Sequence, residues 1–365
     1  MRPSAGTCSS VTLAISLLAY VAVANPGSSP GNVNSNTPGF PAPASTANSK
    51  PEPIRSGLKR MNYYRVMANL PELNDDPILD SGAALHARYL IENNLSNADM
   101  KIERGVPGLL PTGEGGRHEE KNKPGYSEAG AAAAPFGLIL RSDEEVVNGL
   151  SVIDKWIATP FGGLTLLNPQ VTAVGFGQHC ANRECVGVLA FRFGLDRQDY
   201  ERFYEGSTGR LWNPALGAIP PTAGRLRTPI EFPPNGAEVS IASYNANDSP
   251  NPLSSCLDYK APTGSPIFLQ LGKGLSGEEG EVKVSAHSIS DEDVQIESCA
   301  IDAVSYRISD SKAQALARGY LYHYGAVVLI PRKPLQPGHT YKVSIDADSK
   351  LYEWSFRIGQ PSPTR

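Results

Sequence analysis

The sequence predicts an α+β protein in which helices and a β-hairpin come first and a smaller all-β part follows. Apolar residues recur at helical spacing between residues 58 and 90, a pattern typical of amphipathic helices. Two alternating segments around a short turn, within residues 171–193, indicate a β-hairpin. From residue 228 onward, short alternating segments lie between turn signals, which is the pattern of a small β-sandwich.

Length and composition favour two folded domains with many loops. A chain of 365 residues is longer than one typical domain. The 40% hydrophobic content is enough to build cores, while 35 Gly and 31 Pro favour loops and β-structure over a helical bundle. The formal net charge of -4 gives no electrostatic support for nucleic-acid binding, so we expect no nucleic-acid partner.

The N-terminal residues 1–24 resemble a secretory signal peptide. Arg2 carries the positive charge, and the apolar run Val11–Ala24 is short for a membrane span. Ala22-Val23-Ala24 has the small-x-small form of a cleavage site, so we expect cleavage near Ala24 and a secreted or cell-surface protein. The alternative is an uncleaved anchor. Residues 25–54 are rich in Pro, Ser and Asn and are predicted to be a disordered linker.

The cysteines predict two disulfides. Removal of Cys8 with the signal leaves an even number of cysteines, which favours disulfides in an exported protein. Cys180 and Cys185 flank a short loop and suit a bridge at a hairpin tip, while Cys256 and Cys299 both lie in the C-terminal part. A zinc site is the competing interpretation, but the paired C-x-x-C spacing is lacking.

Local signals place three helices in the first part. Order is expected to begin near Ile54; the first helix has apolar residues at helical spacing from Leu58 and ends at Leu70-Pro71, because the residue before proline disfavours the helical conformation. Asp75-Asp76-Pro77 begins the second helix with an Asp cap and a first-turn proline, and Asn93-Asn94 ends it. Ser142-Asp143-Glu144-Glu145 has the form of a capping box and predicts a third helix through Ile157.

The C-terminal strands are predicted from alternating segments. The loop Pro334–Tyr341 fits the turn before a late strand of a β-sandwich. The predicted strand segments are 267–271, 282–285, 294–296, 326–330, 341–345 and 352–358.

Several segments, taken in order, resemble the CAP superfamily of cysteine-rich secretory, antigen 5 and pathogenesis-related (SCP-like) proteins, in particular its bacterial exported branch. The resemblance covers roughly residues 55–195 and implies an α-β-α sandwich for a domain at 55–200. Residues 228–360 resemble the Ig-like β-domain of some bacterial members, with 201–227 as a linker. The segments that carry the resemblance are Leu58–Leu70, His86–Leu90, Gly125–Gly130, Trp156–Pro160, Leu166–Pro169 and Val174–Gly177.

The family resemblance implies a cleft with two His and two acidic residues that can hold a divalent metal such as zinc. His118 resembles the first His and Glu128 the first acid. The second acid is replaced by Ala158 or Thr159, and Gly162 stands where a second His is expected. Two ligands rarely hold zinc in water, so the metal site is predicted to be degenerate.

Three further side chains are weighed as candidate third ligands for His118 and Glu128: Glu119, Glu120 and His179. The preferred interpretation is a solvated polar loop at residues 118–120, with Glu128 accepting backbone hydrogen bonds at a turn. His86, on an apolar helix face, is predicted to be a satisfied core histidine rather than a ligand. The apolar residues 161–167 are predicted to pack beneath the sheet, with an apolar groove as the alternative.

The resulting hypothesis is a secreted, non-enzymatic binding or interaction protein with no catalytic residues and no required cofactor. The resemblance implies a small apolar ligand in the CAP cleft, with a lipid or an extracellular or cell-surface protein as partner. One alternative is a metal-assisted hydrolase that uses His118 and Glu128. Another is a structural cell-surface module in which the β-domain is adhesive.

Overall fold

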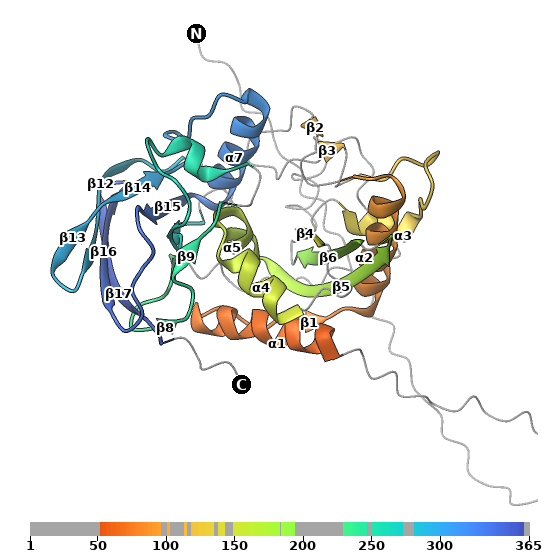
Figure 1. Cartoon of the computed structure of the whole chain (residues 1–365), viewed down its shortest axis with the longest axis horizontal. Helices are drawn as coiled ribbons and strands as arrows, with labels where there is room; N and C mark the ends of the chain where they lie inside the picture. Colours follow the sequence, from red (N-terminus) through yellow and green to blue (C-terminus); the bar gives the residue numbers. More distant parts are fainter. Residues whose placement is uncertain are drawn as a thin grey trace, which may run out of the picture. The chain divides into compact units, whose positions relative to one another are not determined.

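The computed structural model describes most of the chain from Glu52 onward (Figure 1). Residues 49–365 form one compact unit. The predicted signal peptide, most of the N-terminal linker and the linker at 201–227 lie outside the described residues. Described are 52–95, 101–102, 113–114, 118–134, 138–142, 149–182, 184–193, 229–246, 250–272 and 281–360.

The first domain is built on a four-stranded sheet with the order β1-β5-β6-β4. The strands are β1 (Asn74–Asp75), β4 (Leu138–Ser142), β5 (Val171–Ala181) and β6 (Glu184–Phe193). β5 and β6 are the predicted hairpin, and β1 joins β5 in parallel while the other pairs are antiparallel. A short separate pair, β2 (Lys101–Ile102) and β3 (Gly113–Glu114), completes the strands of this part.

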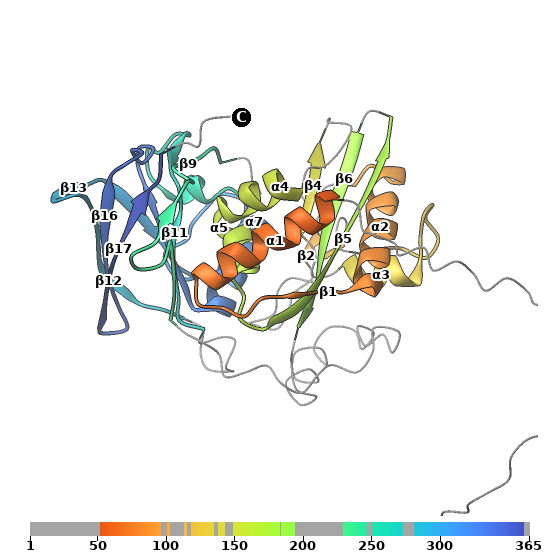
Figure 2. The same cartoon turned by 90° about the horizontal axis from the view of Figure 1, so that it is seen from below.

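Helices cover both faces of this sheet, as Figure 2 shows. α1 (Glu52–Met67) and α4 (Gly149–Ile157) contact each other on one face. α2 (Pro77–Glu92) packs on β5 and β6 from the other face and carries the short α3 (Glu128–Ala133). The α-β-α sandwich is therefore confirmed.

The alternation of side chains along β6 produces these layers. Val186, Val188 and Ala190 belong to the apolar cluster under α2. Leu189 and Phe191 point the other way and join the cluster under α1 and α4. Because successive strand residues face opposite sides, this near-continuous apolar run serves two cores.

Two glycines of β5 let α2 lie directly on the sheet. A Cβ at Gly175 would collide with the backbone at Leu79 and Asp80, and one at Gly177 would collide with the backbone at Ala84. The Val-Gly-Phe-Gly segment is thus explained by close helix–sheet packing, since only glycine leaves room for a backbone at this distance.

The predicted start of α2 is confirmed. Asp76 is the N-cap, and its Oδ1 accepts the N–H of Ile78 at 3.0 Å, with Pro77 in the first turn. Arg192 on β6 donates from Nε to Asp76 Oδ2 at 2.7 Å, which ties the cap to the sheet. The helix ends at Glu92 with Asn93 as its C-cap, as expected.

One boundary differs from the sequence prediction. α1 already begins at Glu52, inside the segment assigned to the linker. The capping box proposed at Ser142–Glu145 lies largely outside the described residues: Ser142 is the last residue of β4 and pairs with Cys185, residues 143–148 are not described, and α4 is described over Gly149–Ile157.

The C-terminal domain contains two sheets. The first has the order β14-β15-β11-β7 and the second β13-β12-β16-β17-β8. The strands of these two sheets, taken in chain order from β7 to β17 without β9 and β10, can be lettered A, A′, B, C, C′, D, E, F and G. The sheets then have the orders D-E-B-A and C′-C-F-G-A′, which is the immunoglobulin-like arrangement. The strands are β7 (Ile230–Phe232), β8 (Glu238–Val239), β11 (Ile267–Gln270), β12 (Val284–Asp291), β13 (Val294–Ile296), β14 (Ser298–Ile301), β15 (Ala326–Pro331), β16 (Thr340–Ala347) and β17 (Lys350–Ile358).

Tyr341 supports this assignment. It lies at the start of β16, and its hydroxyl accepts the backbone N–H of Gln336 at 2.7 Å. A tyrosine that bonds back to the preceding loop at this strand is a hallmark of immunoglobulin-like domains. The predicted role of the loop Pro334–Tyr341 is confirmed.

Some C-terminal elements were not predicted. α7 (Ser311–Tyr324) is inserted between β14 and β15, and its buried residues recur at helical spacing, so the signal was present in the sequence. Further elements that were not predicted are the strands β8 and β14, the short pair β9 (Ser243–Tyr244) and β10 (Thr263–Gly264), and the 3-10 turn η4 (Pro252–Ser255).

Both predicted disulfides are present. Cys180–Cys185 closes the tip of the β5–β6 hairpin with a Cα–Cα distance of 4.1 Å. Cys256–Cys299 joins the segment after η4 to β14, with a Cα–Cα distance of 5.8 Å. These pairings leave no cysteine of the two bridges for a zinc site.

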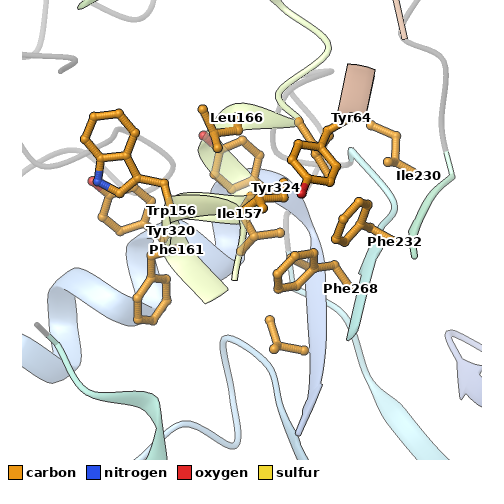
Figure 3. Packing of buried hydrophobic residues seen from close by; sticks show 14 of the residues in the cluster. Tyr64, Trp156, Ile157, Phe161, Leu166, Ile230, Phe232, Phe268, Tyr320 and Tyr324 are labelled. Atoms are coloured by element: carbon orange, nitrogen blue, oxygen red, sulfur yellow. The ribbon is translucent and has the colours of Figure 1, made fainter. Parts of the chain in front are cut away.

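One hydrophobic core runs through both domains. It contains buried residues of α1 and α4 together with residues of β7, β11 and α7. α5 (Pro160–Leu166), which follows α4, is buried along its whole length and contacts β11 and α7. Figure 3 shows part of this packing, with Tyr64, Phe232 and Phe268 close together.

Candidate functional site

The predicted metal residues His118 and Glu128 both lie on exposed positions. His118 begins the described loop before α3, and Glu128 is the first residue of α3. At the start of α3, Ser127 is the N-cap, and its Oγ accepts the N–H of Gly130 at 3.0 Å. Within the described ranges, no group of three or more His, Cys, Asp or Glu is placed to hold a metal ion.

Glu119, by contrast, is buried and is bound to His86. Its Oε1 lies 2.9 Å from His86 Nδ1, and both side chains are fully buried. Its Oε2 accepts the backbone N–H of Ser127 at 3.0 Å. A buried carboxylate needs such partners, so this group anchors the loop 118–127 to α2.

Tyr89 adds a second anchor one turn further along α2. Its ring is stacked with His86 at a centroid distance of 6.2 Å, and its hydroxyl accepts the N–H of Glu120 at 2.9 Å. The Glu120 carboxylate itself points to solvent and pairs with Lys123 at 2.6 Å. Glu119 and Glu120 therefore have different roles: one is an internal anchor and the other a surface residue.

Small residues of α3 make room for this arrangement. A Cβ at Gly130 would lie 2.7 Å from Ser127 Oγ and would collide with Glu119 Oε1. A Cβ at Gly82 on α2 would lie 2.7 Å from the carbonyl oxygen of Ala129. The Gly-Ala run thus lets α3 approach α2 closely while the Glu119 carboxylate fits between them.

The structure therefore pairs residues that sequence reasoning kept apart. His86 is a satisfied buried histidine as expected, but its partner is Glu119, which had been weighed as a metal ligand beside His118. His179 is half-buried on β5. The sequence signal for this pair was His86 itself, because an imidazole on an apolar helix face requires a buried hydrogen-bond partner.

Packing explains the glycine that stands where a second His was expected. A Cβ at Gly162 would lie 2.5 Å from both Thr159 Oγ1 and the carbonyl oxygen of Trp156. Thr159 is the N-cap of α5 and accepts the N–H of Gly162 at 3.2 Å. At Gly163 a Cβ would lie 2.5 Å from Cε2 of Phe268, in the C-terminal domain. This helix docks the second domain and does not face a solvent cleft.

The apolar residues of α5 are buried, but their partners differ from the prediction. Phe161 contacts the rings of Tyr306 and Tyr320, with centroid distances of 6.3 and 5.6 Å. Phe161 was predicted to pack beneath the sheet, but it packs against the C-terminal domain.

An apolar pocket lies on the opposite face of the sheet from the His86–Glu119 pair. It lies between α1, α4 and the sheet, is partly open to solvent, and has a cavity volume of about 20 Å³. Asp75 is its one carboxylate-bearing lining residue. The lining residues are Gly57, Leu58, Met61, Asp75, Val152, Ile153, Trp156, Val174, Phe176 and Leu189.

A polar cluster joins the two helices that line this pocket. Arg60 on α1 donates from Nε to Asp154 Oδ1 on α4 at 2.6 Å. Tyr64 donates its hydroxyl to the same oxygen at 2.8 Å, and the Arg60 guanidinium lies 4.7 Å from the Tyr64 ring centroid. Burial raises the pKa of Tyr64, and the neighbouring Asp154 charge adds to the rise, so the hydroxyl stays protonated as a donor.

The segment that leads from α5 to β5 is held by a buried arginine. Arg65 is fully buried and donates to the carbonyl oxygens of Leu166, Asn168 and Val171, and also to that of Pro71. Burial lowers the pKa of Arg65 to about 10, so it remains charged at neutral pH. The Leu-Leu-Asn-Pro segment is thus positioned by α1.

The fold and site define an α-β-α sandwich domain with an internal apolar pocket, joined to an immunoglobulin-like sandwich. Residues 58–191 match the model of the CAP family, described as the cysteine-rich secretory protein family. This part of the chain is a CAP domain.

Among solved structures, the chain is similar to an extracellular protein containing an SCP domain from Bacillus anthracis str. Ames, determined at 1.5 Å resolution. The identity is 15%, the match covers 42% of this chain and 45% of that chain, and the TM-score is 0.26. The chain thus spans less than half of that protein. No curated protein sequence matches the chain.

Proposed function

We propose that this chain is an exported, non-enzymatic binding protein that takes a small apolar ligand into the pocket between α1, α4 and the sheet. The observation that carries the proposal is the pocket lining, which is apolar apart from Asp75. Ligand sites in proteins are typically concave, mostly apolar and equipped with few polar groups, as this pocket is.

Export is supported by the two disulfides, because such bonds persist in oxidising compartments. It is also supported by the signal-like N-terminus of the sequence. Among the described residues, no helix is both long and apolar enough to cross a membrane.

A non-enzymatic role is supported by the contacts and exposure of the acidic residues and the histidine in the segment 118–128. Glu119 is committed to His86 and to the backbone of Ser127, and His118 and Glu128 are exposed. The apolar pocket lies across the sheet from this loop. No cofactor is required by the proposal.

The test is titration with aminoanthracene, a neutral apolar dye whose fluorescence rises on burial. We expect saturable binding that Val152→Phe abolishes, because the larger ring fills the pocket. Val294→Phe, at an exposed position of β13, is the matched control and should bind as the wild type does. Absence of saturable binding, or equal binding by Val152→Phe, would refute the proposal.

The hydrolase alternative has a separate test. A metal that binds only the folded state raises the melting temperature as its concentration increases. Stabilisation by zinc that is lost in His118→Ala would favour the metal site over the non-enzymatic role. An unchanged melting temperature would support the binding-protein proposal.

A further inference from the structure

One helical wall of the pocket, α1, contacts the C-terminal domain directly, and the other, α4, is linked to it through the following helix, α5. On α1, Met61 lines the pocket and Tyr64, one turn later, packs on Phe232 of β7 at a centroid distance of 5.9 Å. On the other wall, Trp156 lines the pocket near the end of α4, and Gly163 in the following helix lies against Phe268 of β11.

Contacts through buried aromatic rings link α1 to α5, the helix that follows α4. Phe232 and Phe268 stack with a centroid distance of 5.7 Å and an interplanar angle of 17°. The connection therefore runs from Tyr64 on α1 through Phe232 and Phe268 to Gly163 on α5, as Figure 3 shows for the three aromatic residues. All four residues are buried.

The contact leaves little freedom for either wall. Gly163 accepts the Phe268 ring only because it has no Cβ. Packed interiors transmit displacement because they contain few voids, so movement of Phe268 displaces α5 and the end of α4. The walls also contact each other directly, and Arg60 and Tyr64 of α1 both bond to Asp154 of α4; the Arg60–Asp154 ion pair is partly exposed and is a weak restraint by itself.

We propose that the C-terminal sandwich is a clamp that sets the spacing of α1 and α4, so that docking of the sandwich and occupancy of the pocket are thermodynamically coupled. The binding part of this inference rests on the proposed function. If the ligand binds only the clamped state, its apparent dissociation constant rises in proportion as that state is depopulated. By linkage, the ligand in turn strengthens the docking of the sandwich.

The test uses the full chain and two phenylalanine truncations. Phe268→Ala removes the centre of the aromatic connection, and Phe356→Ala removes a buried ring of β17 that belongs to the separate core between the two sheets. The first readout is amide hydrogen exchange of α1 and α4 without ligand. We expect exchange there to become at least tenfold faster in Phe268→Ala and to stay within about threefold of wild type in Phe356→Ala.

The second readout is aminoanthracene binding. Phe268→Ala should raise the dissociation constant about tenfold although Phe268 does not line the pocket. Saturating dye should also slow exchange at β7 and β11 in the wild type. If Phe268→Ala does not fold, Phe268→Leu and Gly163→Ala perturb the same contact more mildly from its two sides, and the same readouts apply.

The outcomes separate the two proposals. Unchanged exchange at α1 and α4 in folded Phe268→Ala, Phe268→Leu and Gly163→Ala would overturn the clamp, whatever the dye does. If the wild type does not bind the dye, the proposed function fails, and exchange alone then decides whether the clamp exists.

Discussion

The sharpest prediction concerns Glu119, whose carboxylate holds the loop 118–127 on α2. Glu119→Ala removes the partner of His86 Nδ1 at 2.9 Å and of the Ser127 N–H at 3.0 Å. Breaking a buried pair by removing one member costs about 3–5 kcal/mol, because the other group is left without compensation. Glu119→Gln keeps the volume and one acceptor, so we expect about 1–3 kcal/mol.

The assay is urea unfolding followed by circular dichroism, with the free energy of unfolding extrapolated to water. The controls are Glu120→Ala and Glu128→Ala, two exposed carboxylates close to Glu119 in the chain. Substitutions at exposed positions usually change stability by about 0.5 kcal/mol or less. The reasoning is refuted if Glu119→Ala costs less than about 1 kcal/mol, or if Glu128→Ala costs as much as Glu119→Ala.

The remaining predictions address other buried groups and the disulfides. Arg65→Lys should cost about 2–5 kcal/mol in urea unfolding, since an ammonium cannot serve all four carbonyl acceptors and each unsatisfied buried group costs about 1–3 kcal/mol; a loss below about 1 kcal/mol would contradict this role. Gln270→Leu should stabilise the protein by about 1–2 kcal/mol, because both side-chain amide atoms of Gln270 are buried without a hydrogen-bond partner; a lower melting temperature would show that the amide is satisfied. By loop entropy, replacing Cys256 and Cys299 by Ser, with a separation of 43 residues, should cost about 4 kcal/mol. The same change at Cys180 and Cys185, with a separation of 5, should cost about 2 kcal/mol, and the reverse order in thermal unfolding would refute the entropic argument.

Local chemistry was sufficient wherever a few neighbouring residues decide the conformation. Asp76 and Pro77 specify the start of α2 by themselves, because the cap and the fixed proline φ act within one turn. The alternating segments of the hairpin and the spacing of Cys180 and Cys185 likewise predicted the β5–β6 pair and its bridge.

The sequence by itself determined the α+β class, the β5–β6 hairpin, both disulfides and the CAP resemblance, which the family match confirms over residues 58–191. Only the tertiary structure decided which residues meet. Glu119 pairs with His86 from 33 positions away, and Gly163 faces Phe268 of another domain. The physical reason is that burial and packing depend on contacts between segments that only the fold brings together. Periodicity and local spacing in the sequence do not specify which distant residues will be in contact.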